Sequence, residues 1–305
     1  MNCPLCDHQF YKPSWIGSTF YQGKEFTYAE CLYCGSLYCD PMPDGEALSQ
    51  MYGADYQSSF VVEASDDGSR NGRRIIGLLK NMESGVFVDY GCGAGSVLTE
   101  AAKLNWRAVG VEFDEGVAAE VEKKTGLEVL THRRFGALDG LRADVLHLGD
   151  VIEHLTEMNR QMPEIIDLIR PGGLLVAQGP LEANPNLFTL TIRLARTLRR
   201  RRRTEMAPYH VLLATARGQR LLFGRLGLEE MEYVTREVAW PAPSRLSLSD
   251  FRRPRSLGLY LLRLASQAIT GLGFAQMGNR YFYVGRRVEN VGGTLVRPGI
   301  SERVE

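Results

Sequence analysis

Two short apolar runs, each ending at an acidic residue, stand out in the hydrophobic and polar pattern of this chain. Residues 86–88 lead into Asp89, and residues 108–111 lead into Glu112. Short apolar runs are typical of strands that are buried on both faces of a parallel sheet. Apolar positions at helical spacing follow the first run, between residues 97 and 104. The pattern predicts strand, turn and helix in succession, as in an open α/β sheet.

The same kinds of pattern continue along the chain and divide it into parts. We expect further strands at residues 127–130, 144–148, 174–177, 229–234 and 280–285, and helices at 73–82, 158–169, 187–198 and 215–226. Residues 1–40 are expected to form a separate N-terminal module, a zinc ribbon on the cysteine pattern described below, and residues 41–84 a linker with helices. The core is expected at 85–287, with insertions at 183–209 and 240–278. Residues 288–305 are expected to be a disordered tail.

Glycine occurs at every second position after the first strand, at Gly91, Gly93 and Gly95. Such residues let the chain turn sharply and bring backbone N–H groups close to a ligand. Asp89 immediately before the turn would repel a pyrophosphate but suits a cationic ligand that carries an α-amino group. Glu112 follows at the spacing, about 20 residues, at which a carboxylate binds ribose hydroxyls. The turn therefore predicts a nucleoside site, and the alternative is a structural turn without a ligand.

Four cysteines lie in two C-x-x-C pairs, Cys3 with Cys6 and Cys31 with Cys34. Each pair has the spacing that offers two thiolates to one tetrahedral ion. We expect a structural Zn²⁺, because four thiolates leave no open coordination position for catalysis. The alternative is four unrelated buried cysteines.

Composition restricts the classes of function. The chain has 305 residues, with 36 Lys and Arg residues against 36 Asp and Glu residues, so it lacks the basic excess of a dedicated nucleic-acid binder. The first residues do not form a signal segment, and no stretch reaches the roughly 18 apolar residues of a membrane span. Six cysteines without a secretion signal indicate a reducing compartment. We therefore expect a cytoplasmic protein.

Residues 3–34, 89–95, 150–154 and 171–173 together resemble a bacterial class I S-adenosylmethionine (SAM)-dependent methyltransferase with an N-terminal zinc ribbon. The core is similar to the group that includes ubiquinone-pathway O-methyltransferases, and ribbon-bearing relatives are associated with methylation of glycans and secondary metabolites. The resemblance implies a Rossmann-like α/β fold whose seven-stranded sheet has an antiparallel last strand. It also implies that SAM crosses the carboxyl ends of the first strands, where the expected contacts are Asp89, Gly91, Gly93, Gly95, Glu112, Gly149 and Asp150.

Catalytic candidates follow the fourth strand, at Asp150, Glu153 and His154, and a further histidine lies at His210. If a helix opens here, the first three share one helix face. In one interpretation they only hold the loop, with Asp150 on the cofactor or the backbone. In a second, His154 or His210 is a general base. In a third, Asp150, Glu153 and His154 bind a divalent cation such as Mg²⁺, because E-x-x-E-H is a metal motif of some related enzymes and this chain has Asp in its first place. A later histidine completes the set in the related RNA enzymes, and His210 can take that part.

The two insertions carry basic and apolar segments. The first combines an apolar stripe with Arg199–Arg203, within residues 187–203, and the second contains an apolar helix at 256–277. Each segment can contact the inner face of a membrane peripherally. The arginines can instead bind an anionic substrate or RNA phosphates, or be solvated. The apolar helix can cover a substrate or form a dimer.

The leading hypothesis is a SAM-dependent methyltransferase that acts on a hydroxyl of a small metabolite, a glycan precursor or a lipid-linked intermediate. The alternative is an RNA methyltransferase that holds RNA with the zinc ribbon and Arg199–Arg203. A third possibility is a non-catalytic SAM-binding subunit. The acceptor and the oligomeric state are not specified by the sequence.

Overall fold

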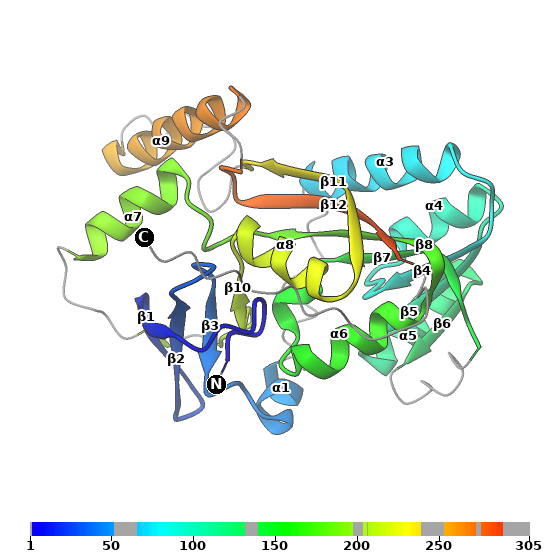
Figure 1. The fold of residues 1–305 in the computed structure, drawn as a ribbon, viewed down its shortest axis with the longest axis horizontal. Coiled ribbons are helices and arrows are strands. Elements are labelled where there is room, and N and C mark those ends of the chain that lie inside the picture. The colour runs from blue at the N-terminus through cyan, green and yellow to red at the C-terminus, as the bar shows by residue number, and fades with distance from the viewer. Residues whose placement is uncertain are drawn as a thin grey trace, which may run out of the picture.

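The structure, a computed structural model, describes residues 2–51, 66–131, 140–197, 204–205, 207–238, 253–272 and 276–288. These residues form two β-sheets with helices around them (Figure 1). The predicted tail beyond residue 288, the Arg199–Arg203 run and residues 239–252 of the second insertion lie outside the described residues.

The larger sheet has the seven strands that the resemblance implied. They are β4 (Val86–Tyr90), β5 (Arg107–Glu112), β6 (Glu128–Thr131), β7 (Ala143–Gly149), β8 (Ile169–Pro180), β11 (Leu228–Arg236) and β12 (Arg280–Arg287), in the spatial order β11-β12-β8-β7-β4-β5-β6. Strand β12 runs antiparallel to both of its neighbours, and the paired strands from β8 to β6 are parallel. The predicted fold class is therefore confirmed.

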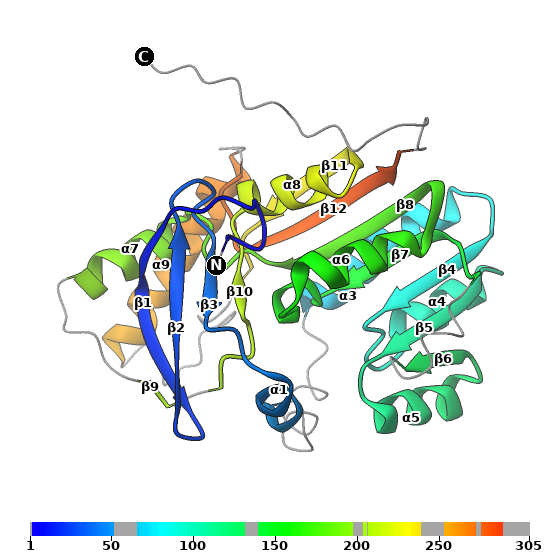
Figure 2. The ribbon, with the colours of Figure 1, turned by 60° about the horizontal axis from the view of Figure 1, so that its bottom comes forward.

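Alternate side chains of the central strands enter two separate cores. Phe87, Val145 and Val176 pack beneath α3 (Asp66–Lys80), α4 (Ser96–Lys103) and α5 (Glu115–Thr125). Their neighbours on the same strands face α6 (Met158–Asp167) and α8 (Ala216–Arg225). Figure 2 shows α6 and α3 on opposite faces of the sheet. Burial on both faces explains why these strands are apolar runs in the sequence.

Two boundaries differ from the prediction. Helix α3 begins at Asp66, earlier than the predicted residue 73. Residues 170–173 were expected to separate a helix from the fifth strand, but they lie within β8. The β7–β8 register jumps there, from Ala143 opposite Ile169 to Val145 opposite Leu174. The Pro-Gly-Gly segment therefore forms an irregularity inside the strand.

The smaller sheet contains the N-terminal segment. Its strands are β1 (Tyr11–Tyr21), β2 (Lys24–Cys31), β3 (Leu37–Asp40), β9 (Thr204–Glu205) and β10 (Leu212–Leu213), in the order β10-β3-β2-β1-β9. Strand β9 comes from the first insertion and β10 directly follows it, so later segments complete the N-terminal sheet. Leu5 and Leu37 belong to the same buried cluster as Leu146 and Leu175 of the large sheet. The two sheets therefore share one hydrophobic core.

The remaining elements are α1 (Gly45–Met51), the short 3-10 turn η2 (Ile152–His154), α7 (Leu187–Thr197) and α9 (Pro254–Gly271). Both insertions thus contain the helices that their apolar patterns predicted. Helices α7 and α9 pack against each other beside the smaller sheet (Figure 1). Among the described helices, none combines the length and the apolar character that crossing a bilayer requires.

Candidate active site

The glycine turn between β4 and α4 has a conformation that only glycine adopts easily. Gly91, Gly93 and Gly95 have φ angles of 80°, 49° and 72°, all in the left-handed region. A Cβ atom on Gly91 would lie 2.5 Å from Val151 Cγ2, and one on Gly95 would lie 2.7 Å from Val121 Cγ1. A Cβ on Gly93 would meet no described atom within 4 Å. The outer glycines therefore permit close packing, whereas Gly93 faces open space that a ligand can enter.

Glu112 stands at the carboxyl end of β5 with its carboxylate held by backbone amides. The Gly93 N–H donates to Glu112 Oε2 at 2.9 Å, and the Phe113 N–H donates to Oε1 at 2.8 Å. Each carboxylate oxygen accepts more than one hydrogen bond, so both can still bind ligand hydroxyls. An open glycine turn beside a fixed carboxylate fits the nucleoside part of SAM.

Asp89 has a partner that the sequence analysis did not find. Its carboxylate accepts a 2.7 Å hydrogen bond from Nδ1 of His147 on β7, and both side chains are almost wholly buried. Asp89 and His147 are register partners on adjacent parallel strands, so strand pairing could have revealed the contact. The expected contact of Asp89 with the cofactor stays a prediction. The contact with His147 shows that Asp89 also joins two central strands.

Gly149 and Asp150 lie at the end of β7. A Cβ on Gly149 would lie 2.8 Å from His147 Cε1, so a larger residue does not fit there without rearrangement. Asp150 has a left-handed φ of 55°, and its Oδ1 forms a 2.7 Å ion pair with Nη1 of Arg280 on β12. The predicted contacts of both residues with SAM stay predictions.

Glu153, His154 and His210 come together beside this strand end, with one potential ligand atom from each within 4.8 Å of the others. Nδ1 of His154 donates to the Tyr209 carbonyl oxygen at 2.8 Å, and Nδ1 of His210 donates to Glu182 Oε2 at 2.8 Å. The two imidazole centroids are 4.9 Å apart. Glu182 was not predicted, although its place directly after β8 at the same edge of the sheet was a usable signal.

The predicted Mg²⁺ set of Asp150, Glu153 and His154 is brought together only in part, and its role in metal binding stays a prediction. The left-handed backbone at Asp150 prevents one continuous helix from carrying all three side chains, and only Ile152–His154 forms a short turn. Asp150 instead pairs with Arg280, and His210 takes the third place beside Glu153 and His154.

The segment that leads into the histidine cluster packs against the glycine turn. Strands β4 and β7 are adjacent and parallel, so the segments that follow them meet at one edge of the sheet. Val151, which precedes the η2 turn, packs onto Gly91. Binding and catalytic candidates from several segments are thus placed side by side, as the carboxyl edge of an open α/β sheet allows.

Comparison with known proteins agrees with this geometry. The family model described as a methyltransferase domain matches residues 65–229, more than half of the chain. The chain belongs to this methyltransferase family. The family and the class I fold that the sequence predicted are both confirmed.

Two curated relatives of this methyltransferase are ubiquinone biosynthesis O-methyltransferases. The protein from Dinoroseobacter shibae is 32% identical over 111 residues, and the protein from Ruegeria pomeroyi is 31% identical over 111 residues. Each match covers 34% of this chain and 44% of the relative, so it spans less than half of the relatives' length.

Solved structures with a similar chain course include two methyltransferases. A SAM-dependent methyltransferase from Archaeoglobus fulgidus is 18% identical with a TM-score of 0.46, and covers 77% of this chain and 99% of its own. Magnesium protoporphyrin IX methyltransferase from Synechocystis PCC 6803, solved with bound SAH, is 12% identical with a TM-score of 0.48, and covers 80% and 100%.

Charges in the histidine cluster of this methyltransferase depend strongly on burial. Burial raises the pKa of Glu153 to about 8, and the charge of Asp150 adds to the effect. Burial lowers the pKa of His154 to about 4, assisted by His210. Burial also opposes the charge of His210, but its hydrogen bond to Glu182 and the surrounding carboxylates raise its pKa to about 9. Near neutral pH the cluster therefore holds a protonated Glu153, a neutral His154 and a His210–Glu182 ion pair.

The four N-terminal cysteines converge as the spacing predicted. The Sγ atoms of Cys3 and Cys34 are 3.7 Å apart, those of Cys6 and Cys31 are 3.5 Å apart, and all four lie within 4.8 Å of one another. Tetrahedral Zn²⁺ with Zn–S bonds of about 2.3 Å places sulfur atoms about 3.8 Å apart. None of the six cysteines, all of which are described, is in a disulfide. The thiol positions fit a zinc ion.

Proposed function

We propose that this protein transfers a methyl group from SAM to a hydroxyl of a small-molecule acceptor, with His210 as the general base. The observation that carries the proposal is the His210–Glu182 pair, which lies in a cluster with Glu153 and His154. Val151, just before Glu153 and His154 in the chain, packs against Gly91 of the glycine turn. The curated relatives are O-methyltransferases, which supports a hydroxyl acceptor.

Bound SAM supplies a methyl group on a positively charged sulfur. Methyl transfer is an in-line displacement, so the protein contributes mainly by alignment. A hydroxyl acceptor must also lose its proton. Nδ1 of His210 is bonded to Glu182, so Nε2 is the nitrogen that takes this proton. The Glu182 carboxylate then stabilises the imidazolium that forms.

His210 is a better candidate than His154 because of its partner. Glu182 is a carboxylate and favours the protonated imidazole, whereas the Tyr209 carbonyl that holds His154 carries no charge. The pKa of His210 is raised to about 9 and that of His154 is lowered to about 4, so His210 is the stronger base. His154 is left as a neutral neighbour that helps to position the acceptor.

The histidine base is also favoured over a divalent cation. Glu153 has its pKa raised to about 8, so it would have to lose a proton before it bound an ion near neutral pH. The Nδ1 atoms of His154 and His210 are both engaged with protein oxygens. A cation would therefore have to bind the remaining Nε2 atoms, and it would compete with the proton that Glu153 holds.

The N-terminal sheet is the proposed side of entry for the acceptor. The Tyr28 hydroxyl donates to the His210 carbonyl oxygen at 2.8 Å, so this sheet reaches the base. A cavity of about 450 Å³ on the same sheet is lined by Tyr28 together with Tyr11, Ser14, Thr27 and Asp40. Such polar groups suit a hydroxylated metabolite, a glycan precursor or the polar part of a lipid-linked intermediate. The RNA alternative depends on Arg199–Arg203, which lie outside the described residues.

We also propose that Cys3, Cys6, Cys31 and Cys34 hold a structural Zn²⁺, because their sulfur separations fit that ion. The ion would join the segment before β1, which carries Cys3 and Cys6, to the end of β2 and the β2–β3 loop, which carry Cys31 and Cys34. The shared core implies that it would stabilise the whole fold and not the N-terminal sheet alone.

The test is methyl transfer from labelled SAM to a panel of hydroxylated acceptors and their amine analogues, as a function of pH. Because the base must be deprotonated, kcat/KM should rise with pH towards about 9. Glu182→Gln should shift the rising limb of the kcat/KM–pH profile to lower pH by about 1–3 units, because the carboxylate that stabilises the protonated imidazole is lost. His210→Ala should remove the limb.

A weak chelator that leaves the four-cysteine site loaded serves as the control for a catalytic cation. Turnover should persist in its presence. Turnover that is lost on chelation and restored by Mg²⁺ would support the cation instead. A Glu182→Gln variant that is slower at every pH, with no shift of the limb, would show only a structural role for Glu182.

A further inference from the structure

The turn that carries Glu182, directly after β8, is fixed by backbone hydrogen bonds on both sides. The Leu181 N–H donates to the Asn279 carbonyl oxygen at 2.7 Å, and the Ala183 N–H donates to the Ala214 carbonyl oxygen at 3.2 Å. Leu181 and Ala183 are buried, whereas 25% of the Glu182 side chain is exposed. The turn thus buries the apolar residues on either side of Glu182 and leaves its carboxylate facing the proposed base.

Asn184 closes this turn and connects it to two distant segments. It is 2% exposed, and its Nδ2 donates to the carbonyl oxygens of Gln276 and of Gly278, the latter at 3.0 Å. Its Oδ1 accepts from the Ala216 N–H at the start of α8, also at 3.0 Å. A side-chain amide offers two donor hydrogens and an acceptor oxygen, and all three are used here. Because these partners are backbone groups, Asn184 fixes the course of the chain around the turn.

The segment that Asn184 holds leads directly into a second charged residue of the site. Arg280 follows Gly278 closely in the chain, and its guanidinium forms a 2.7 Å ion pair with Asp150 at the end of β7. Gly278 has a φ of 147°, and a Cβ on it would lie 2.6 Å from the carbonyl oxygen at the end of β11, so this segment is closely packed. Asn184 therefore links the chain around Glu182 to the chain before Arg280.

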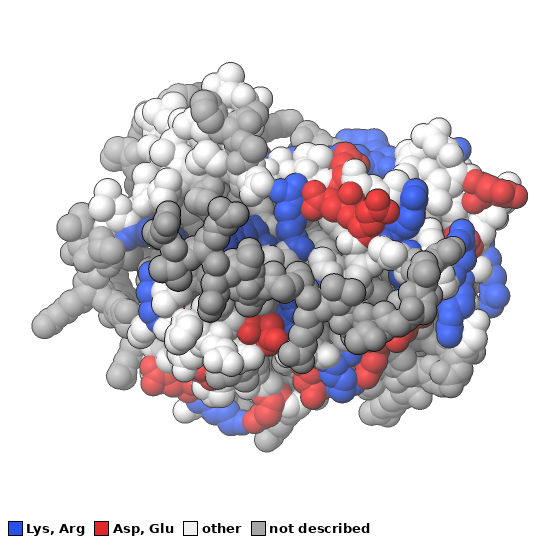
Figure 3. Space-filling model, in the orientation of Figure 1, with Lys and Arg blue, Asp and Glu red and all other residues white. Residues whose placement is uncertain are grey.

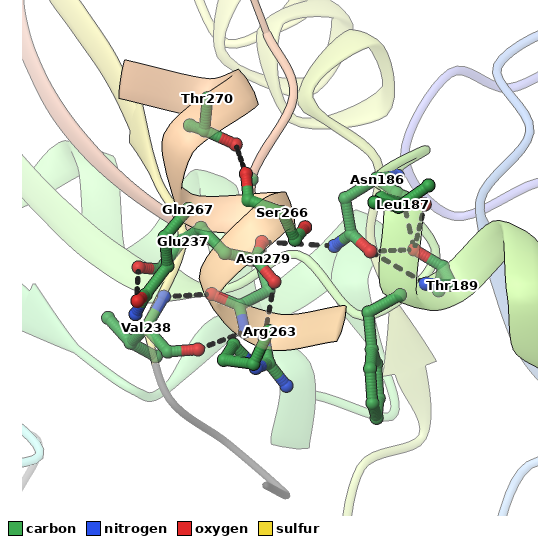
Figure 4. A network of polar contacts seen from close by, with 12 residues as sticks. Asn186, Leu187, Thr189, Glu237, Val238, Arg263, Ser266, Gln267, Thr270 and Asn279 are labelled. Atoms are coloured by element: carbon green, nitrogen blue, oxygen red, sulfur yellow. Dashed lines mark hydrogen bonds and ion pairs between the residues drawn. The ribbon is translucent and has the colours of Figure 1, made fainter. Parts of the chain in front are cut away.

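A second anchor, two residues further along, connects the same segment to α9. Asn186 Nδ2 donates to Glu237 Oε2 at 3.2 Å, and Glu237 forms a buried ion pair with Arg263 of α9. The next residue, Val238, donates its N–H to Asn279 Oδ1 at 2.8 Å. Figure 4 shows this network between α7 and α9. Helix α9 is thus tied to the chain on both sides of the site.

The charge that α9 contributes to this network lies inside the protein. Arg263 is 1% exposed, and the described surface over α9, at the upper left of Figure 3, carries no charged side chain. A buried ion pair adds little net stability, because the cost of removing two charges from water offsets their attraction. The pair is better explained by the geometry that it fixes, since the network holds the chain both after Glu182 and before Arg280.

We propose that Asn184 is a positioning residue of the methyl-transfer site, which holds the Glu182 carboxylate against Nδ1 of His210. Glu182 and His210 lie on separate segments, so their 2.8 Å hydrogen bond requires a fixed distance between these segments. Asn184 provides it, because Ala216, to which it is bonded, follows His210 on the same segment. The inference rests on the proposed function, in which His210 is the base, and Asn184 itself takes no part in proton transfer.

The test compares Asn184→Ala with wild type in the full-length protein by two measurements. The first is the pKa of His210, followed by NMR of histidine-labelled protein without an acceptor. It should fall by about 1 unit, because the carboxylate that favours the protonated imidazole is held less closely. The second is the kcat/KM–pH profile, whose rising limb should shift to lower pH by a similar amount.

A double variant tests whether the two residues act through one interaction. Adding Asn184→Ala to Glu182→Gln should shift neither the pKa of His210 nor the limb any further, because the interaction that Asn184 supports is already lost. The other groups that face His210, which are Glu153, His154 and Asp150, are the same in each variant.

The matched control is Leu79→Ala, because Leu79 is also buried but belongs to the core on the opposite face of the large sheet. It should lower stability without changing either measurement, and SAM binding should be equal in all variants as a check on folding. Asn184→Ser is a milder second variant in case Asn184→Ala does not fold, since a serine hydroxyl is too short to reach both segments.

Two results would overturn the inference. One is an unchanged pKa of His210 in a folded Asn184 variant, and the other is a double variant in which the two shifts add up. A pKa of His210 that falls in Asn184→Ala, together with a kcat/KM profile that depends on neither His210 nor Glu182, would support the positioning by Asn184 and refute the proposed base.

Discussion

Replacing Glu153 with Gln should change how the stability of the fold depends on pH. The side chain of Glu153 lies beside the histidine cluster and is 5% exposed, and its Oε1 has no hydrogen-bond partner among the described residues. Burial raises its pKa to about 8. Glutamine has nearly the same shape but does not ionise, so the substitution removes the titration with little change in volume.

The direction follows from proton binding. In the unfolded chain Glu153 ionises near the ordinary glutamate pKa of 4.5, whereas burial in the folded protein raises its pKa to about 8. Between these pH values the unfolded chain has released the proton and the folded protein still holds it. The free energy of unfolding therefore falls as pH rises. The slope is about 1.4 kcal/mol per pH unit for one proton, so Glu153 should lower the free energy of unfolding by on the order of 4–5 kcal/mol across the window.

His210 acts in the same direction at higher pH. Its pKa is raised from 6.5 to about 9, so its stabilising effect is complete below 6.5 and is lost as pH rises through about 9. Comparison of wild type with Glu153→Gln isolates the Glu153 part up to about pH 8. At higher pH the ionised Glu153 also raises the pKa of His210, so the variant changes the His210 part as well. The matched control is Glu83→Gln, which changes an exposed glutamate in the loop before β4.

The assay is urea unfolding followed by circular dichroism at several pH values between about 5 and about 9, with the free energy of unfolding obtained by linear extrapolation. The difference between Glu153→Gln and wild type should move in favour of the variant as pH rises, and should level off above about 8. Glu83→Gln should follow wild type. If wild type and Glu153→Gln give parallel curves, Glu153 is already ionised in the fold and the reasoning fails.

Three other predictions test the cofactor site and the zinc site. Glu112→Ala should weaken SAM binding by about 1.5–3 kcal/mol, roughly ten- to a hundredfold, in calorimetry, whereas Glu120→Ala on an exposed part of α5 should not. Gly91→Ala should lower the midpoint of urea unfolding, because its Cβ would lie 2.5 Å from Val151 and its φ is 80°; an unchanged midpoint would contradict the packing role. Cys31→Ser should reduce the zinc content measured by elemental analysis, and should lower the melting temperature of the whole protein in one transition because the core is shared. Separate melting of the N-terminal sheet would contradict the last expectation.

The sequence was sufficient for the features that depend on local pattern. The apolar runs before Asp89 and Glu112 predict buried strands, because a strand covered on both faces has few polar positions. The paired cysteines are similarly local, since two thiolates at C-x-x-C spacing reach one ion from one turn. These features needed no knowledge of distant partners.

Features that depend on contacts between distant segments were missed. Asp150 pairs with Arg280, which is 130 residues away, and Glu182 binds His210 from another segment. The buried side of α9 is also unexpected, because an apolar helix normally turns its leucines inward. Arg263 is buried there because Glu237, from the segment after β11, supplies the opposite charge. Such pairings are set by the assembled fold, and neither Arg263 nor Glu237 carries a signal of the pairing in its local sequence.

The second cysteine pair is connected to the proposed base through a short series of contacts. The Thr215 hydroxyl donates to the Cys34 carbonyl oxygen at 2.7 Å, and its oxygen also accepts from the Gly218 N–H at the start of α8. On β2, which ends at Cys31, the Tyr28 hydroxyl donates a 2.8 Å hydrogen bond to the carbonyl oxygen of His210. Strand β10, which directly follows His210, pairs with β3 of the same sheet. A metal with four thiolate ligands has no open coordination position for catalysis. Here it would instead hold in place the sheet against which His210, the proposed base, lies. We therefore expect loss of the metal to lower methyl transfer more than SAM binding, because the glycine turn and Glu112 belong to the other sheet.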